Sequence, residues 1–169
     1  MSKRPAADYW IEKLQLTTHI EGGAFREVYR SALIAPSAAL PVSFTGNRSF
    51  CTSIYFLLQQ EQFSAFHKIG SDEIWHFYYG DALLVYEIDA QGKLTVHRLG
   101  SNFEKGESFQ CVIAAGNWFA ARIAPGGEYA LVGCTVSPGF DFTDFELANG
   151  DALATLFPQH DQLIRKLSK

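Results

Sequence analysis

FHKIGSDEIWHFYYG, residues 66–80, is the stretch of sequence that decides the fold. His67 stands two positions before Ile69, Glu73 follows after three more residues, and Gly80 closes the segment after another six. Because side chains alternate along a strand, His67 and Ile69 are expected to share one face. The spacing is that of a metal site in a small β-barrel, with isoleucine in place of a second histidine.

The segments around this stretch read as further strands, since they are rich in aromatic and β-branched residues and are divided by turn residues. We expect strands at residues 25–31, 50–58, 64–69, 73–79, 83–88, 94–99, 109–114, 119–123 and 129–136. Short, regularly spaced strands with hairpin turns at 89–92 and 125–127 indicate a sandwich or barrel. Amphipathic patterns at 6–16 and after residue 149 predict a short helix near each end.

The bulk properties favour one domain over residues 1–169, with 47% hydrophobic residues to build its core. A net charge of -4 and scattered Lys and Arg argue against a nucleic-acid partner. No window approaches the ~20 apolar residues that cross a bilayer, and no signal peptide is evident, so we expect a soluble cytoplasmic protein without a membrane partner. Cys51, Cys111 and Cys134 form no CxxC pair, which favours reduced thiols.

The chain resembles a known family in five segments: HIEGGAFREVYRS, SIYFLL, HKIGSDEIWHFYYGD, AAGNWFAA and CTVSPGFDFTDFELA. On these motifs it is similar to the single-domain cupin 5 type family, whose members are largely uncharacterised. The resemblance implies an all-β fold, the double-stranded β-helix or cupin jelly-roll barrel, related in shape to sugar epimerases such as RmlC and commonly homodimeric. It also implies that Phe119 holds the place of a third metal-binding histidine. Ile20 and Ala114 stand where the family would have proline.

The two missing histidine ligands, at Ile69 and Phe119, decide whether a bound metal is expected. Catalytic sites need three protein ligands, whereas His67 and Glu73 supply two, and Ile69 and Phe119 cannot coordinate. We therefore predict no cofactor. A divalent metal held by His67, Glu73 and a non-standard ligand set stays an alternative. In a regular strand His76 points away from the Glu73 face, and only a β-bulge would bring it inward.

Without a metal, the pocket becomes an apolar cavity that holds an imidazole and a carboxyl group. Burial raises the pKa of a carboxyl such as Glu73 towards neutrality. A proton-abstracting enzyme needs this arrangement, with His67 as general base and Glu73 orienting it or returning a proton. The alternative is that His67 and Glu73 only bond each other within an inherited polar core.

Further residues are candidates for ligand contacts. Gly22 and Gly23 permit a tight turn that brings Glu21 and Arg26 over the barrel mouth, where an arginine suits a carboxylate or phosphate. The alternative for Arg26 is a surface salt bridge. The other candidate substrate-binding residues are Tyr55, His76, Tyr78, Gln110, Trp118 and Phe119. Residues 137–146, SPGFDFTDFE, are interpreted as an ordered loop rather than a site.

The leading functional hypothesis is a metal-independent isomerase or epimerase that acts on a small polar metabolite such as a sugar derivative. One alternative is a non-enzymatic cupin that binds a small ligand. Another is a metal-dependent oxygenase or isomerase with a non-standard ligand set. A homodimer is expected because an exposed edge strand pairs readily with a second copy.

Overall fold

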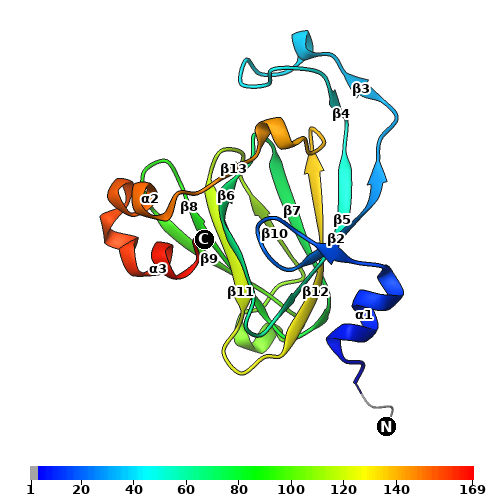
Figure 1. Ribbon diagram of the computed structural model, residues 1–169, viewed down its shortest axis with the longest axis vertical. Helices are drawn as coiled ribbons and strands as arrows, with labels where there is room; N and C mark the ends of the chain where they lie inside the picture. Colours follow the sequence, from blue (N-terminus) through cyan, green and yellow to red (C-terminus); the bar gives the residue numbers. More distant parts are fainter. Residues whose placement is uncertain (1–3) are drawn as a thin grey trace.

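The computed structural model describes residues 4–169, and two antiparallel sheets form the body of the molecule (Figure 1). The first sheet has the strand order β1 (Thr17–Thr18), β2 (Ala24–Arg30), β5 (Thr52–Gln59), β12 (Tyr129–Ser137), β7 (Asp72–Gly80) and β10 (Gln110–Ile113). The second has the order β13 (Glu146–Leu147), β6 (Phe63–Lys68), β11 (Trp118–Ile123), β8 (Leu83–Ile88) and β9 (Leu94–Leu99). Neighbouring strands are mostly far apart in sequence, as in a jelly roll. The all-β jelly-roll fold is therefore confirmed.

The nine expected strands are all present, each within two residues of its predicted bounds. Alternation of apolar side chains along them fills the space between the sheets. Trp75 of the first sheet makes edge-on ring contacts with Phe56 of the same sheet, at 5.9 Å between ring centres, and with Phe119 of the second sheet, at 6.3 Å. Each fully buried side chain of this kind stabilises the fold by about 2–3 kcal/mol. This core holds the two sheets in a fixed relation.

Helices form near both ends of the chain, as the sequence patterns predict, and they pack on the outer faces of the two sheets. The helix α1 (Ala7–Leu14) packs Trp10 and Leu14 with Leu57 and Leu131 of the first sheet. The helices α2 (Gly150–Leu156) and α3 (Asp161–Lys166) lie beside the second sheet (Figure 1). Short 3-10 turns occupy Ser37–Ala39, Phe103–Lys105, Phe142–Asp144 and Pro158–His160. Among residues 4–169, no helix is long and apolar enough to span a membrane.

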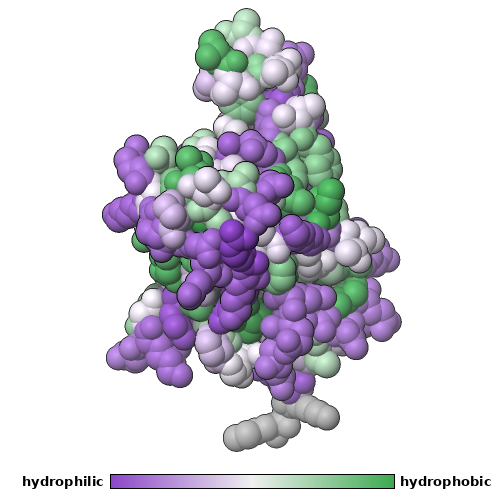
Figure 2. All heavy atoms as spheres, turned by 60° about the vertical axis from the view of Figure 1, so that its left-hand side comes forward, coloured by the Kyte–Doolittle hydropathy of each residue, from purple (hydrophilic) through white to green (hydrophobic). Residues whose placement is uncertain are grey.

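An arm, residues 31–50, projects beyond the barrel and was not expected from the sequence (Figures 1 and 2). It contains the short strands β3 (Ile34–Ala35) and β4 (Arg48–Ser49). Its base is fixed by Arg48, whose Nε and Nη2 donate to the two carboxylate oxygens of Asp144, each over 2.6 Å. This ion pair ties the arm to the loop of residues 138–145, which follows β12.

Candidate functional site

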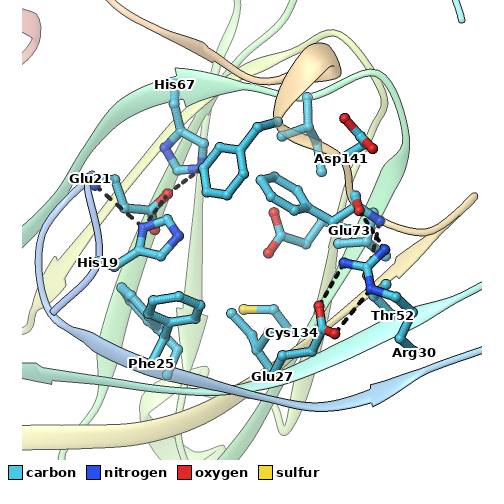
Figure 3. Close-up of a pocket in the computed structure, with 16 residues that line it drawn as sticks. His19, Glu21, Phe25, Glu27, Arg30, Thr52, His67, Glu73, Cys134 and Asp141 are labelled. Atoms are coloured by element: carbon cyan, nitrogen blue, oxygen red, sulfur yellow. Dashed lines mark hydrogen bonds and ion pairs between the residues drawn. The ribbon is translucent and has the colours of Figure 1, made fainter. Parts of the chain in front are cut away.

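A cavity of about 280 Å³ opens between the two sheets (Figure 3). It is bounded by strands β2, β5, β6, β7 and β12, by the loop before β2, and by the loop 138–145. The residues that line it are His19, Glu21, Phe25, Glu27, Arg30, Thr52, Ile54, Phe56, His67, Ile69, Glu73, Cys134, Val136, Phe140, Asp141 and Phe142. The cavity therefore combines phenyl rings and aliphatic side chains with several carboxyl groups and imidazoles.

Residues from the deciding stretch face this cavity. His67, from β6, and Ile69, just beyond its end, lie on the wall together, as strand alternation predicts. Glu73 reaches the cavity from β7 in the other sheet, and its side chain is almost fully buried. The two predicted catalytic residues thus stand on different walls of one cavity.

Glu21 reaches the site through the tight turn that follows it. Gly22 has φ +121°, and a Cβ there would collide with the carbonyl oxygen of Phe63, so glycine is required. The turn lays the chain against β6, where the amide of Ala65 donates to the Glu21 carbonyl over 2.9 Å. Ser64 Oγ donates to Glu21 Oε1 over 2.8 Å. The turn therefore places Glu21 beside the barrel opening, the position that the sequence predicted.

His67 and Glu21 share one proton. The Nδ1 atom of His67 lies 2.7 Å from the carbonyl oxygen of Ala65. Since a carbonyl only accepts, Nδ1 must carry a hydrogen. Nε2 lies 3.0 Å from Oε2 of Glu21 (Figure 3). A hydrogen bond at this distance needs a proton on one of the two atoms, either as imidazolium with carboxylate or as imidazole with carboxylic acid.

His19 lies on the other side of Glu21 and completes this corner of the cavity. Its Nδ1 accepts the backbone N–H of Glu21 over 3.3 Å. Burial lowers the pKa of His19, although the charge of Glu21 opposes this. Since Nδ1 already accepts a hydrogen bond, the ring is neutral, and we regard its 3.5 Å separation from Glu21 Oε2 as a polar contact rather than an ion pair.

Glu73 is the second titratable group of the cavity. Burial raises its pKa from 4.5 to about 8, and the charge of Glu21 adds to the rise, while Cys134 and Trp75 oppose it. Burial likewise raises the pKa of the Cys134 thiol, so this sulfur stays neutral. Glu73 consequently holds or releases a proton close to neutral pH.

A bulge in β2 places two charged residues at the cavity. Phe25 and Glu27 face inward by simple alternation, and the register against β5 shifts between Glu27 and Tyr29. One extra residue brings Arg30 onto the inner face instead of Tyr29. Arg30 donates to both carboxylate oxygens of Glu27 over 3.0 and 2.7 Å, and to the carbonyl of Phe140 over 3.1 Å. This arginine therefore ties β2 to the loop 138–145.

The loop 138–145 forms a wall of the cavity, which corrects its interpretation as a loop without a role in the site. Phe140, Asp141 and Phe142 line the cavity. Asp141 also caps the following 3-10 turn, as expected, since its Oδ1 accepts the N–H of Thr143 over 2.9 Å. Three phenylalanines within six residues, 140–145, were the signal for this wall, because exposed loops rarely carry so many apolar rings.

Five of the predicted ligand contacts point away from the cavity, which corrects the expectation that they bind its ligand. They are Arg26, Tyr55, His76, Tyr78 and Gln110. Arg26 follows the inward Phe25 and donates to the carbonyl of Leu14 over 3.1 Å. His76 sits between Thr135 Oγ1 at 3.0 Å and Gln110 Nε2 at 2.9 Å on the outer face of the first sheet. All five placements follow from the alternation of side chains between the two faces of a strand.

Trp118 and Phe119 also lie outside the cavity lining. Trp118 faces outward on β11, where Lys68 Nζ lies 4.5 Å from its ring centre. Phe119 is fully buried behind His67, with ring centres 4.1 Å apart. Its role is to support the imidazole, and the predicted ligand contact of both residues is corrected.

Several cavity residues were missing from the predicted site: His19, Glu27, Arg30, Thr52, Cys134 and Asp141. The position of Arg30 depends on a bulge that alternation does not reveal. Cys134 and Thr52 lie on long strands whose inward face becomes known only from the pairing of β12 with β5 and β7. These residues depend on tertiary register rather than on local pattern.

Comparison with known proteins agrees with this geometry. Residues 8–148 match the family model Cupin_5, described as Cupin superfamily (DUF985). The chain belongs to this cupin family. An uncharacterised protein of Saccharomyces cerevisiae, YML079W, is 31% identical in an alignment 153 residues long, which covers 83% of this cupin and 74% of the yeast protein.

Solved structures show the same fold over most of the chain. A hypothetical protein from Leishmania major has a TM-score of 0.89 and 35% identity, covering 97% of this cupin and 99% of its own chain. Protein SO0799 from Shewanella oneidensis has a TM-score of 0.87 and 39% identity, covering 98% and 99%. Oxalate decarboxylase from Bacillus subtilis, at 16% identity and a TM-score of 0.53, shares the fold, and this cupin covers 36% of its chain.

The donor set of the cavity does not match the metal site that the cupin fold implies. Ile69 and Phe119 occupy two positions that would carry ligands, and neither side chain can coordinate. Within residues 4–169, no group of three or more His, Cys, Asp or Glu side chains is placed to hold a metal ion. His67 is instead engaged by Glu21 and Ala65. The chemistry below is therefore derived from the side chains alone.

Proposed function

We propose that this cupin is a metal-independent enzyme that moves a proton on a small polar metabolite, as an isomerase or epimerase does. The observation that supports it is the pairing of two proton-holding sites in one cavity, the Glu21–His67 pair and Glu73. Apolar side chains such as Ile54, Ile69 and Val136 surround them. Among apolar side chains, such groups act more strongly on a bound ligand than they would in water.

Glu73 is assigned as the general base. Its pKa of about 8 lies near neutrality, where a catalytic group exchanges protons with a substrate most efficiently. The Glu21–His67 pair is assigned as the acid, because it already holds a proton and the Ala65 carbonyl fixes the tautomer of its ring. These roles are the reverse of those expected from the sequence, where His67 was the base.

The two sites approach a ligand from different sheets, since His67 belongs to β6 and Glu73 to β7. An epimerase needs two such groups, one that removes a proton and another that supplies one. Tyr55 and Tyr78, which the sequence suggested as substrate contacts, lie outside the cavity. Glu73 and the Glu21–His67 pair supply both groups without them.

The test is hydrogen exchange in deuterium oxide. The purified protein is incubated with a panel of aldoses, ketoses and amino sugars, and uptake of one deuterium at carbon is read by mass spectrometry. We expect uptake by at least one compound and its loss in Glu73→Gln and His67→Gln. His97→Gln is the matched control, because His97 bonds Glu87 on other strands, over 2.7 Å, and should leave exchange unchanged. Exchange that survives both site substitutions contradicts the proposal.

A second candidate function is ligand binding without turnover. It is favoured by the hydrogen bonds that Glu21 and His67 already make within the protein. Glu21 accepts from Ser64, His67 donates to the Ala65 carbonyl, and the two side chains bond each other. A polar group satisfied in this way is stable without any reaction to perform. Tight retention of a compound with no deuterium uptake would favour this function over catalysis.

A further inference from the structure

The walls of the cavity have the chemistry of a site for organic cations. Four phenyl rings line it, from Phe25, Phe56, Phe140 and Phe142. Four carboxyl groups line it as well, from Glu21, Glu27, Glu73 and Asp141. Figure 3 shows the Glu73 carboxyl group in the middle of this ring of side chains. Aromatic faces and carboxylates both attract positive charge.

The basic side chains that line the cavity are either paired with an acidic group or uncharged. Arg30 is the one Lys or Arg among the described residues on the wall, and its guanidinium is engaged by Glu27 and by the Phe140 carbonyl. The Glu21–His67 pair holds one proton and is neutral as a unit. His19 is neutral because burial lowers its pKa. An anionic ligand would therefore enter without an available cation and would face the carboxyl groups of Glu73 and Asp141.

We propose that the ligand of this cavity is a small organic cation, an ammonium compound of about the size of choline, held by the phenyl rings with the Glu73 carboxylate as its counter-ion. This proposal names the substrate class of the proposed function. It rests on the proposed function in one respect, namely that the cavity is the ligand site. It also replaces the carboxylate or phosphate that Arg26 suggested from the sequence, because Arg26 lies outside the cavity.

Binding of a cation is coupled to release of a proton from Glu73. In the free protein, burial keeps this carboxyl group protonated near neutral pH. A positive charge beside it lowers its pKa, so the proton leaves as the cation enters. The other charged or titratable groups around Glu73 are His19, Glu21, Glu27, Arg30, His67, Cys111, Cys134 and Asp141. Burial keeps both thiols neutral, and Glu27 and Arg30 are paired with each other. The released proton is thus assigned to Glu73, which becomes the base that the proposed reaction requires.

The test is calorimetric titration of the full chain with three ligands of matched shape: choline, the neutral 3,3-dimethylbutan-1-ol and the anionic 3,3-dimethylbutanoate. Choline is expected to bind about tenfold more tightly than the alcohol, which corresponds to about 1.4 kcal/mol, and the anion is expected not to bind. At pH 7, titration in phosphate and in MOPS buffer, which carries no net positive charge, should reveal a proton released with choline and none with the alcohol.

Two variants separate the contribution of the Glu73 charge to binding from that of the phenyl rings. Glu73→Gln should remove the proton release and reduce the preference for choline to less than about threefold. Phe142→Leu, at a ring that is 60% exposed, keeps an apolar side chain and should weaken choline without weakening the alcohol. Equal or tighter binding of the alcohol, binding of the anion, or failure of all three ligands to bind would overturn the proposal. Deuterium exchange on an uncharged compound alone would support the proposed function while contradicting this ligand class.

Discussion

Nε2 of His67 lies 3.0 Å from Oε2 of Glu21, and this contact joins a strand of the second sheet to the turn that precedes the first long strand. Because Nδ1 of the same ring is bonded to the Ala65 carbonyl, the contact contains a single proton. The position of that proton defines the site. The predictions below test how the chain builds this arrangement and how it responds to pH.

Glu73 should make the stability of the protein fall as pH rises. Its pKa is 4.5 as an ordinary side chain and about 8 in the folded protein, so the folded state binds more protons between these values. The free energy of unfolding should lose roughly 1 kcal/mol per pH unit across this window relative to Glu73→Gln, and nothing further above pH 8. Urea unfolding of both proteins from pH 5 to 9 measures the difference. Parallel curves would show that Glu73 titrates normally.

Gly22→Ala should disrupt the site more than an alanine at another glycine of positive φ. A Cβ at Gly22 collides with the Phe63 carbonyl oxygen, so the turn that holds Glu21 must move. We expect a loss of about 3 kcal/mol in the free energy of unfolding, together with loss of ligand binding. The control is Gly126→Ala, where φ is +85° and no atom lies within 4 Å, with a cost of about 1 kcal/mol. Equal costs would mean that the turn adapts.

Arg48→Met should loosen the arm and the loop 138–145 together. The Arg48 side chain is 5% exposed and forms two hydrogen bonds to Asp144, so its removal leaves a buried carboxylate without its partner. The expected cost is about 3 kcal/mol in urea unfolding. Arg165→Met removes a guanidinium that pairs with Asp161 on the surface, and should leave the urea midpoint unchanged. Faster amide exchange at Phe140 and Phe145, whose N–H groups are hydrogen-bonded to Thr52 and to the Phe142 carbonyl, would confirm in the Arg48 variant that the loop is affected.

The arm should associate with a second copy of the chain. Leu33, Ile34 and Val42 are more than half exposed on it, and exposed apolar side chains favour protein contacts. Light scattering is expected to give twice the chain mass of 18.8 kDa. A variant with Leu33→Ser and Ile34→Ser should shift the mass towards the monomer. A strictly monomeric parent protein would contradict the expected homodimer.

The barrel could be predicted from the sequence because its strands are local patterns. Turn residues and β-branched runs locate the strands, and alternation places His67 and Ile69 on one face. The site could be predicted only in part, since its remaining residues depend on long-range register. The bulge after Glu27 turns the Arg30 side chain from the outer to the inner face of β2, and nothing in the local sequence indicates this bulge. Outward residues such as His76 and Tyr55 are polar or aromatic like the inward ones, so residue type did not separate the faces.

The interpretation of the loop 138–145 failed for a related reason. Asp141 does cap a turn, as its residue type indicates, and this role did not exclude a second one at the cavity wall. The arm escaped prediction because its two strands have only two residues each, too few for a periodic pattern. Its anchoring depends on the contact of Arg48 with Asp144, which are 96 residues apart in the sequence.

The most direct test of the account is the protonation of the His67 ring, read from long-range proton–nitrogen correlations in ¹⁵N-labelled protein and assigned with His67→Gln. The account predicts a hydrogen on Nδ1, and an Nε2 signal that shifts towards a free lone pair in Glu21→Ala, where the shared proton has lost its second holder. An Nε2 signal that is already that of a free lone pair in the parent protein, and that Glu21→Ala leaves unchanged, would contradict the shared proton, and with it the proposed role of the Glu21–His67 pair.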